Sequence, residues 1–311
     1  MQGGIIPPQS VGKSPTLKSM SETARREQKM SKNIYEMVTA RIIEQLEQGV
    51  IPWHKPWTGT AGAWSRSTGK PYSLLNQWLM PQGEYATFNQ IKKEGGKVKK
   101  GEHGYPVVFF KPTVIETEDK NGEKVKKTVP LLKYYTVFNI SEQVEGLEVK
   151  HSKETVERHH EPLAELETIK TDYLKRSGVE FYNLEQDKAY YSPADDSIVL
   201  PLVEQFDSIE EYYSTAFHEM AHSTGHSTRL NRLNKLAAFG SDDYGKEELI
   251  AEITAAAVLN EAGIETEKTI KNSAAYVQNW ANAIKGDVKL IVHASSKAQK
   301  AFELIMNMQG A

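Results

Sequence analysis

The chain has 311 residues, of which 25% are charged and 39% are hydrophobic, as is typical of a soluble globular protein. It contains no cysteine, which excludes a disulfide scaffold, a thiolate zinc site, an iron–sulfur cluster and a cysteine nucleophile. No stretch approaches the roughly 20 apolar residues that cross a bilayer, and the N-terminus lacks the apolar region of a signal peptide. We therefore expect a cytoplasmic protein without a membrane partner.

The net charge of −3 averages over two unlike halves. Residues 1–150 contain 22 Lys and Arg against 15 Asp and Glu, a balance of +7, whereas the rest contain 16 against 26, a balance of −10. A basic half is a hint of interaction with nucleic acid or a membrane surface. Length and charge together predict two domains, at residues 31–150 and 151–311, after a leader at residues 1–30 that we expect to be disordered.

The basic half reads as a compact α+β domain. Apolar residues recur every four positions after Ser31, which predicts a helix that begins there and ends at Gly49. A short helix that breaks at two glycines, Gly95–Gly96, follows further on. Residues 105–116 and 125–138 are then typical of two strands, joined as a β-hairpin by a polar turn that contains Asn-Gly.

The acidic half reads as a mainly helical domain with a small sheet. Three short segments, separated by turn residues, are rich in residues that favour β-strands, which predicts three short strands. The remaining segments have helical periodicity. The expected helices cover residues 155–176, 209–225, 246–262, 271–285 and 288–308, and the expected strands cover residues 181–183, 188–191 and 197–200.

An HExxH motif, His218-Glu219-Met220-Ala221-His222, lies in the first long helix after the strands. On a helix, residues four apart share one face, so His218 and His222 can reach one metal ion. Glu219 lies beside that face, where its carboxylate can take a proton from a metal-bound water. The alternative is a pair of surface histidines on an ordinary helix.

Zinc needs a third protein ligand, for which the next helix offers the better candidates. We predict Glu248 as the ligand and Glu252, one turn further, as the acceptor of a hydrogen bond from a ligand histidine. Glu247 remains an alternative ligand, and any one of these carboxylates could instead be solvated. Downstream of the motif stands His226, which we expect near the metal but not bound to it.

The reaction that this set predicts is metal-assisted hydrolysis of a peptide bond, with one Zn²⁺ per chain and a protein substrate. Glu219 would act as general base and pass the proton to the leaving amine. Tyr244 and His226 are candidate donors to the oxyanion. A structural or inactive metal domain is the alternative.

The basic half carries lysines interleaved with aromatic rings, which favours binding to single-stranded DNA. Such binding combines positive charge along the backbone with rings on which bases stack. The alternatives are that the lysines form a solvated turn and that the rings belong to the core. The candidate DNA-binding residues are Trp53, Lys55, Trp57, Trp64, Tyr72, Lys92, Lys93, Lys97, Lys99, Lys100 and Lys111.

Several segments of both halves resemble one known family. In the basic half these are NIYEMVTARIIEQLEQGVIPWHKPW, GKPYSLLNQWLM, ATFNQIKKEGGKVKKGEHGYPVVFF and YYTVFNISEQVEGL, and in the acidic half AFHEMAHSTGHSTRLNR and YGKEELIAEITAAAVL. They resemble the single-stranded-DNA-binding domain and the zincin-like metallopeptidase domain of ArdC-type antirestriction proteins. A similar N-terminal domain begins TraC-type primases.

The resemblance implies a protein of a mobile element that coats incoming single strands and guards transferred DNA against restriction during conjugation. It also supports a metal site of two histidines and a glutamate. Two alternatives remain open: a DNA-binding protein whose zincin domain is inactive, and a protease directed at a host protein whose basic half only docks it to nucleic acid. Antirestriction that depends on Glu219 would favour the protease.

Overall fold

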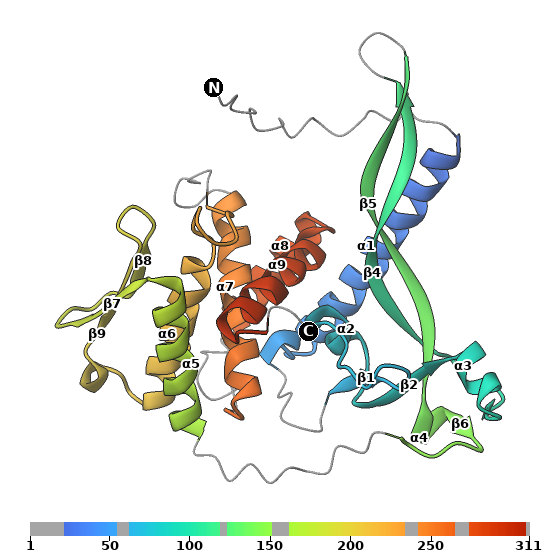
Figure 1. Ribbon diagram of the computed structural model, residues 1–311, viewed down its shortest axis with the longest axis horizontal. Helices are drawn as coiled ribbons and strands as arrows, with labels where there is room; N and C mark the ends of the chain where they lie inside the picture. The colour runs from blue at the N-terminus through green and yellow to red at the C-terminus, as the bar shows by residue number, and fades with distance from the viewer. Residues whose placement is uncertain are drawn as a thin grey trace, which may run out of the picture. The chain divides into compact units, whose positions relative to one another are not determined.

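The computed structural model describes residues 22–54, 62–118, 123–150, 162–233, 242–264 and 274–308 (Figure 1). The chain forms two compact units. Unit 1 combines Met1–Ile34 with Phe109–Lys133, and unit 2 combines Tyr35–Val108 with Tyr134–Ala311. The helices and small sheets confirm the expected mixed α+β class.

The N-terminal helix α1 (Glu22–Glu47) begins earlier than predicted, so part of the predicted leader is helical. Glu, Ala, Arg, Gln and Lys dominate residues 22–29, and they favour a helix without any apolar stripe. Ser31, which we expected to cap the helix, instead accepts a hydrogen bond from the backbone N–H of Leu132 at 3.1 Å, within unit 1. The predicted end of the helix is confirmed, because Gly49 follows α1 with a φ of +78°.

The predicted hairpin is formed by the two longest strands, β4 (Tyr105–Glu118) and β5 (Lys124–Asn139). With β1 (Ala63–Ser65) and β2 (Gly83–Thr87) they make a sheet of order β1-β2-β5-β4, in which β1 is parallel and β5 antiparallel to β2. The short elements around this sheet are η2 (Pro52–His54), α2 (Leu74–Leu79), α3 (Phe88–Lys93), β3 (Lys97–Val98), α4 (Ile140–Gln143) and β6 (Val144–Glu145).

A capping box fixes helix α3 to the end of β2. Thr87 accepts a hydrogen bond from the backbone N–H of Gln90, and the Gln90 side chain accepts one from the backbone N–H of Thr87. These two bonds satisfy donors that the helix itself cannot satisfy. The helix ends before the predicted glycine pair, and Gly95 has a φ of +87°.

In its described residues, the C-terminal half contains one small sheet and several helices, as predicted. The sheet has the order β7-β9-β8, with β7 parallel and β8 antiparallel to the central β9. The elements are α5 (Pro162–Ser177), β7 (Glu180–Leu184), β8 (Tyr190–Ser192), β9 (Ser197–Pro201), η3 (Val203–Gln205), α6 (Ile209–Ser223), α7 (Asp242–Glu261), α8 (Ala274–Gly286) and α9 (Leu290–Ile305).

Helix α7 lies between α6 and α9 and packs against both (Figure 1). Its apolar residues point in several directions, since Leu249, Ile250, Ile253 and Val258 are all buried. A helix that is apolar on more than one side belongs inside a domain. This position allows α7 to present different side chains to α6 and to α9.

Within unit 2, residues from both predicted domains are in contact. The hydroxyl of Thr39 on α1 donates a hydrogen bond to the carbonyl of Val288 at 2.8 Å, and the backbone N–H of Leu74 donates one to the side chain of Gln299 at 3.0 Å. The segment η2 packs against α7 and places His54 in a buried position. Among the described residues, no helix is long and apolar enough to span a membrane.

Candidate metal centre and basic surface

Three side chains from α6 and α7 converge at the HExxH motif. The Nε2 atoms of His218 and His222 are 3.1 Å apart, as the i,i+4 spacing predicts. Glu248, on α7, directs Oε2 to Nε2 of His218 and Oε1 to Nε2 of His222, both at 3.5 Å. One ligand atom from each of the three lies within 4.8 Å of the others.

This spacing fits a single metal ion. Two nitrogen or oxygen ligands at 2.0–2.2 Å from a tetrahedral zinc ion stand about 3.3–3.6 Å apart. The electrostatics fit as well. Burial disfavours a charged imidazole, but hydrogen bonds to Glu248 and Glu252 outweigh it and raise the pKa of His218 to about 10. The surrounding carboxylates therefore favour positive charge at this point.

Each histidine has a second carboxylate at its other ring nitrogen. Nδ1 of His218 lies 3.5 Å from Oε2 of Glu252, and Nδ1 of His222 lies 3.7 Å from Oε1 of Glu247. Outer carboxylates of this kind fix the orientation of a ligating imidazole. The arrangement is nearly symmetric, with Glu248 between the two Nε2 atoms and one carboxylate behind each ring.

Glu252 is held in turn by two residues from distant parts of the chain. The hydroxyl of Tyr276 on α8 donates a hydrogen bond to its Oε1, and Nε2 of buried His54 lies 3.8 Å from the same atom. Although burial opposes ionisation, contacts with His218, His54 and Tyr276 lower the pKa of Glu252. It is therefore a carboxylate that faces His218.

Glu247 is engaged by an arginine. Arg232 approaches it with both Nη2 and Nε, at 2.7 and 3.2 Å, and also donates to the carbonyl of Ala221 and the hydroxyl of Thr224. Burial raises the pKa of Glu247, but the interactions with His222 and Arg232 outweigh burial, so the pKa lies below its ordinary value. The bidentate ion pair occupies this carboxylate, whereas both oxygens of Glu248 face the histidines.

The remaining predicted residues take different places. Glu219 is 8% exposed and lies on α6 next to His218, whose pKa its charge helps to raise. The imidazole of His226 is 2.9 Å from the hydroxyl of Thr228 and lies outside the three-residue group. The side chain of Tyr244 falls outside the part of the chain that the structure describes.

Tyr276, Arg232 and His54 also belong to this centre, and the sequence alone does not predict them there. Arg232 follows the HExxH motif closely in the sequence, and a basic residue there could have been expected to pair with one of the three glutamates. Tyr276 and His54 carry no such signal, because Tyr276 lies on a different helix, α8, and His54 lies in the basic half of the chain. Only the folded chain brings them to Glu252.

The predicted lysines form an exposed basic surface around α3 and β3. Lys92, Lys93, Lys97 and Lys100 are exposed, whereas Lys99 is half-buried and donates a hydrogen bond to the carbonyl of Glu142 at 2.6 Å. We call these five residues the α3–β3 basic surface. The exposed Lys111 belongs to unit 1.

Most predicted rings do not lie on this surface as exposed platforms. Trp53 is 1% exposed and packs against Trp78 and Trp280, and Trp64 is 8% exposed. Tyr72 is half-buried, and Lys55 and Trp57 lie outside the described residues. In this conformation neither Trp53 nor Trp64 presents a ring face to a base.

An aromatic ring outside the predicted set does project from α3. Phe88 is the first residue of the helix and is 55% exposed. Lys92 stands four residues later, so the two side chains share one face of the helix. A single exposed apolar ring is common on a protein surface, so Phe88 is of interest because lysines lie beside it and not because of its exposure alone. The signal was available in the sequence as TFNQIKK.

Comparison with known proteins agrees with this architecture. Residues 32–138 match the N-terminal domain of the anti-restriction factor ArdC, and residues 170–297 match a zincin-like metallopeptidase family. The crystal structure of the antirestriction protein ArdC from plasmid R388, in its metal-free form, is 35% identical with a TM-score of 0.66, over 88% of this chain and 96% of that chain. This chain belongs to the ArdC antirestriction family.

Two further relatives of this ArdC-family chain are informative. The Mn(II)-bound structure of the R388 protein is 32% identical with the same TM-score of 0.66, over 88% of this chain and 97% of that one. DNA primase TraC from Escherichia coli is 36% identical over 89% of this chain, which spans only 27% of the length of the primase. The zincin-like domain implies a metal ion, and the three-residue group fits one.

Proposed function

We propose that this protein binds single-stranded DNA through its N-terminal half and hydrolyses a peptide bond at a zinc centre in its C-terminal half. The observation that carries the proposal is the convergence of His218, His222 and Glu248 with Glu219 beside them. Two histidines and one carboxylate are a ligand set of catalytic zinc sites that leave a position open. Without cysteine, the chain offers zinc no thiolate.

The chain's own residues then have separate roles. His218, His222 and Glu248 would hold the ion, which polarises the substrate carbonyl and acidifies a water when bound. Glu219 would accept the proton of that water and deliver it to the leaving amine. Glu252 and Glu247 orient the two imidazoles. The Mn(II)-bound structure of the R388 relative supports a divalent ion in this protein.

The test of hydrolysis compares the wild type with Glu219→Gln. Cleavage of a peptide library should disappear in the variant, while metal content measured by mass spectrometry stays at one ion per chain. Glutamine has the same shape but cannot accept the proton. If neither protein cleaves any peptide while both retain the ion, the centre is structural and the hydrolase proposal is wrong.

The DNA proposal is supported by the α3–β3 basic surface and the exposed Phe88. Each base stacked on an aromatic ring contributes roughly 1–3 kcal/mol. Phe88→Ala should therefore weaken binding of an oligothymidylate about 5–150-fold by fluorescence anisotropy. Tyr182→Ala, which removes a similarly exposed ring from β7, is the matched control and should bind normally. Equal loss in both variants would contradict stacking on Phe88.

We further propose that the protein serves a mobile element in the cytoplasm by coating transferred single strands. The family membership and the primase relative, which bears this segment as part of a longer chain, support that role. Restriction of a conjugated plasmid should fall when the wild type is supplied in the recipient. Coating predicts that Glu219→Gln protects equally, whereas protection lost in this variant would favour a proteolytic mechanism.

A further inference from the structure

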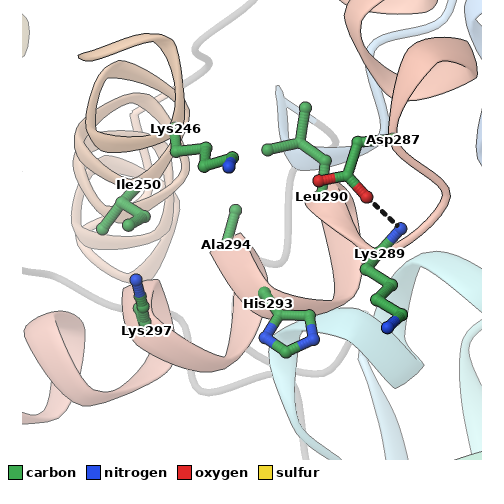
Figure 2. Close-up of a pocket in the computed structure, with 8 residues that line it drawn as sticks. All are labelled: Lys246, Ile250, Asp287, Lys289, Leu290, His293, Ala294 and Lys297. Atoms are coloured by element: carbon green, nitrogen blue, oxygen red, sulfur yellow. Dashed lines mark hydrogen bonds between the residues drawn. The ribbon is translucent and has the colours of Figure 1, made fainter. Parts of the chain in front are cut away.

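A second charged site lies on the opposite side of α7 from the metal centre. A cavity of about 320 Å³ opens between α7, the loop after α8 and α9 (Figure 2). We call it the α7–α9 pocket. Its lining residues are Lys246, Ile250, Asp287, Lys289, Leu290, His293, Ala294 and Lys297.

The pocket is strongly basic although it lies in the acidic half of the chain. Figure 2 shows Lys246 on α7 and His293 and Lys297 on α9 arranged around Ala294. The one carboxylate in the lining, Asp287, accepts a hydrogen bond from the backbone N–H of Lys289 at 2.9 Å. The lining therefore contains three lysines and one carboxylate, and that carboxylate already accepts a hydrogen bond.

The imidazole in the pocket responds to this positive charge. Burial lowers the pKa of His293, and the charges of Lys289, Lys297 and Lys246 lower it further, while Asp287 opposes them. Neutral His293 leaves the lysines as the cationic groups of the pocket. Because all three lysine charges act on this one imidazole, the pocket has a positive potential, which attracts an anion.

The aromatic neighbour of the pocket comes from the DNA-binding half. The ring of Tyr35 on α1 stacks on His293 with centroids 5.8 Å apart, and its hydroxyl is 3.3 Å from Nε2. Nζ of Lys289 lies 5.8 Å from the centroid of the same ring. Residue 35 belongs to the segment that matches the ArdC N-terminal domain.

We propose that the α7–α9 pocket binds a phosphate group, and that the backbone of single-stranded DNA supplies it. Lysine ammonium groups recognise a phosphate as point charges, without reading a base. The contact of Tyr35 with the pocket favours DNA over a free phosphate, because α1 belongs to the half proposed to bind the strand. The DNA source rests on the proposed function, whereas phosphate binding does not.

The test uses the full chain and two charge-matched double variants. Lys289→Gln with Lys297→Gln neutralises the pocket away from the metal centre. Lys175→Gln with Lys300→Gln removes the same charge from exposed positions on α5 and α9 outside the lining. Because all four lysines are exposed, melting temperatures should match the wild type. Lys289→Arg with Lys297→Arg keeps the charge and should bind like the wild type.

Two ligands are titrated into each protein. Inorganic phosphate is measured by calorimetry against chloride at constant ionic strength, and an oligothymidylate by anisotropy at several salt concentrations. The pocket variant should lose about tenfold in affinity for both, and its salt slope for DNA should fall by about 0.7 for the lost phosphate contact. The control variant should lose neither.

Each other outcome overturns part of the proposal. Equal losses in the pocket and control variants mean that only overall charge matters, and unchanged phosphate affinity in the pocket variant refutes the site. Loss of phosphate alone, with DNA binding unchanged, refutes DNA as the source. If the wild type binds no single strand at any salt concentration, the proposed function fails, and the phosphate titration still decides the pocket.

Discussion

Glu252→Gln should weaken metal binding although Glu252 is not one of the three proposed ligands. Its carboxylate lies 3.5 Å from Nδ1 of His218, and its charge favours the orientation that directs Nε2 at Glu248. Loss of such an outer carboxylate lowers metal affinity about 10–100-fold, or about 1.4–2.7 kcal/mol. Glutamine fits the same space but removes the charge, so the effect on folding should be smaller than that on the metal.

Tyr276 should act through Glu252 and not separately. Its hydroxyl donates to Oε1 of Glu252, so Tyr276→Phe frees that carboxylate to turn from His218. We expect a loss of up to about tenfold, because Tyr276 is one contact further from the ion. The double variant should be no weaker than Glu252→Gln alone, within about 0.5 kcal/mol.

The assay is zinc titration of the full chain in competition with a chelating dye. Tyr182→Phe is the matched control, since the hydroxyl of Tyr182 donates to Glu180 in an exposed Tyr–Glu pair on β7. It should bind zinc like the wild type. An affinity of Glu252→Gln within twofold of the wild type, or losses that simply add in the double variant, would refute the chain of contacts from Tyr276 to His218.

Three other outcomes follow from the structure. Gly104→Ala should lower the free energy of unfolding in urea by about 1–3 kcal/mol, because the new Cβ would clash with Cγ2 of Thr136 and lie 2.6 Å from the carbonyl oxygen of Val137. Gly286→Ala, whose Cβ would meet nothing within 4 Å, should leave the free energy of unfolding unchanged. Asp196→Ala should lower the free energy of unfolding by about 3 kcal/mol, because Arg229 is 7% exposed and loses its carboxylate partner. Burial opposes ionisation of Asp196, but hydrogen bonds from Arg229 and Tyr191 outweigh it and lower the pKa of Asp196. The contribution of Asp196 to the free energy of unfolding is therefore present above the ordinary carboxyl range and is lost as the pH falls below that range. Because the variant lacks this contribution, its unfolding in urea should depend less on acid pH than that of the wild type. Zinc at about 100 times its dissociation constant should stabilise the wild type by about 2.7 kcal/mol in thermal melts, and an equal shift in Glu248→Gln would contradict that residue's role.

Local patterns predicted much of this protein from its sequence. His218 and His222 lie on one helix, and the glutamates of α7 lie together on another. Within a single helix the spacing in sequence determines which side chains share a face, so both pairs could be predicted from the sequence. Strand alternation and the Asn-Gly turn likewise predicted the hairpin of β4 and β5. Helix α1 begins earlier than apolar periodicity predicts, because residues 22–29 favour a helix through their propensity and carry no apolar stripe.

The contacts between distant segments could not be predicted. His54 reaches Glu252 from the other half of the chain, and Tyr35 reaches His293 in the same way. The sequence neighbours of Trp53 predict a stacking ring, whereas the structure buries that ring against Trp78 and Trp280. Composition and spacing carry no information on which of two aromatic residues the fold will cover.

The most direct test of the central claim is the metal content of the purified chain after zinc titration and removal of excess ion. We predict one ion per chain for the wild type, and none for the variant that combines His218→Ala, His222→Ala and Glu248→Gln. Glu247→Gln, which removes the carboxylate paired with Arg232, should retain the ion at reduced affinity. A triple variant that still holds one ion per chain, or a wild type that holds none, would contradict the assignment.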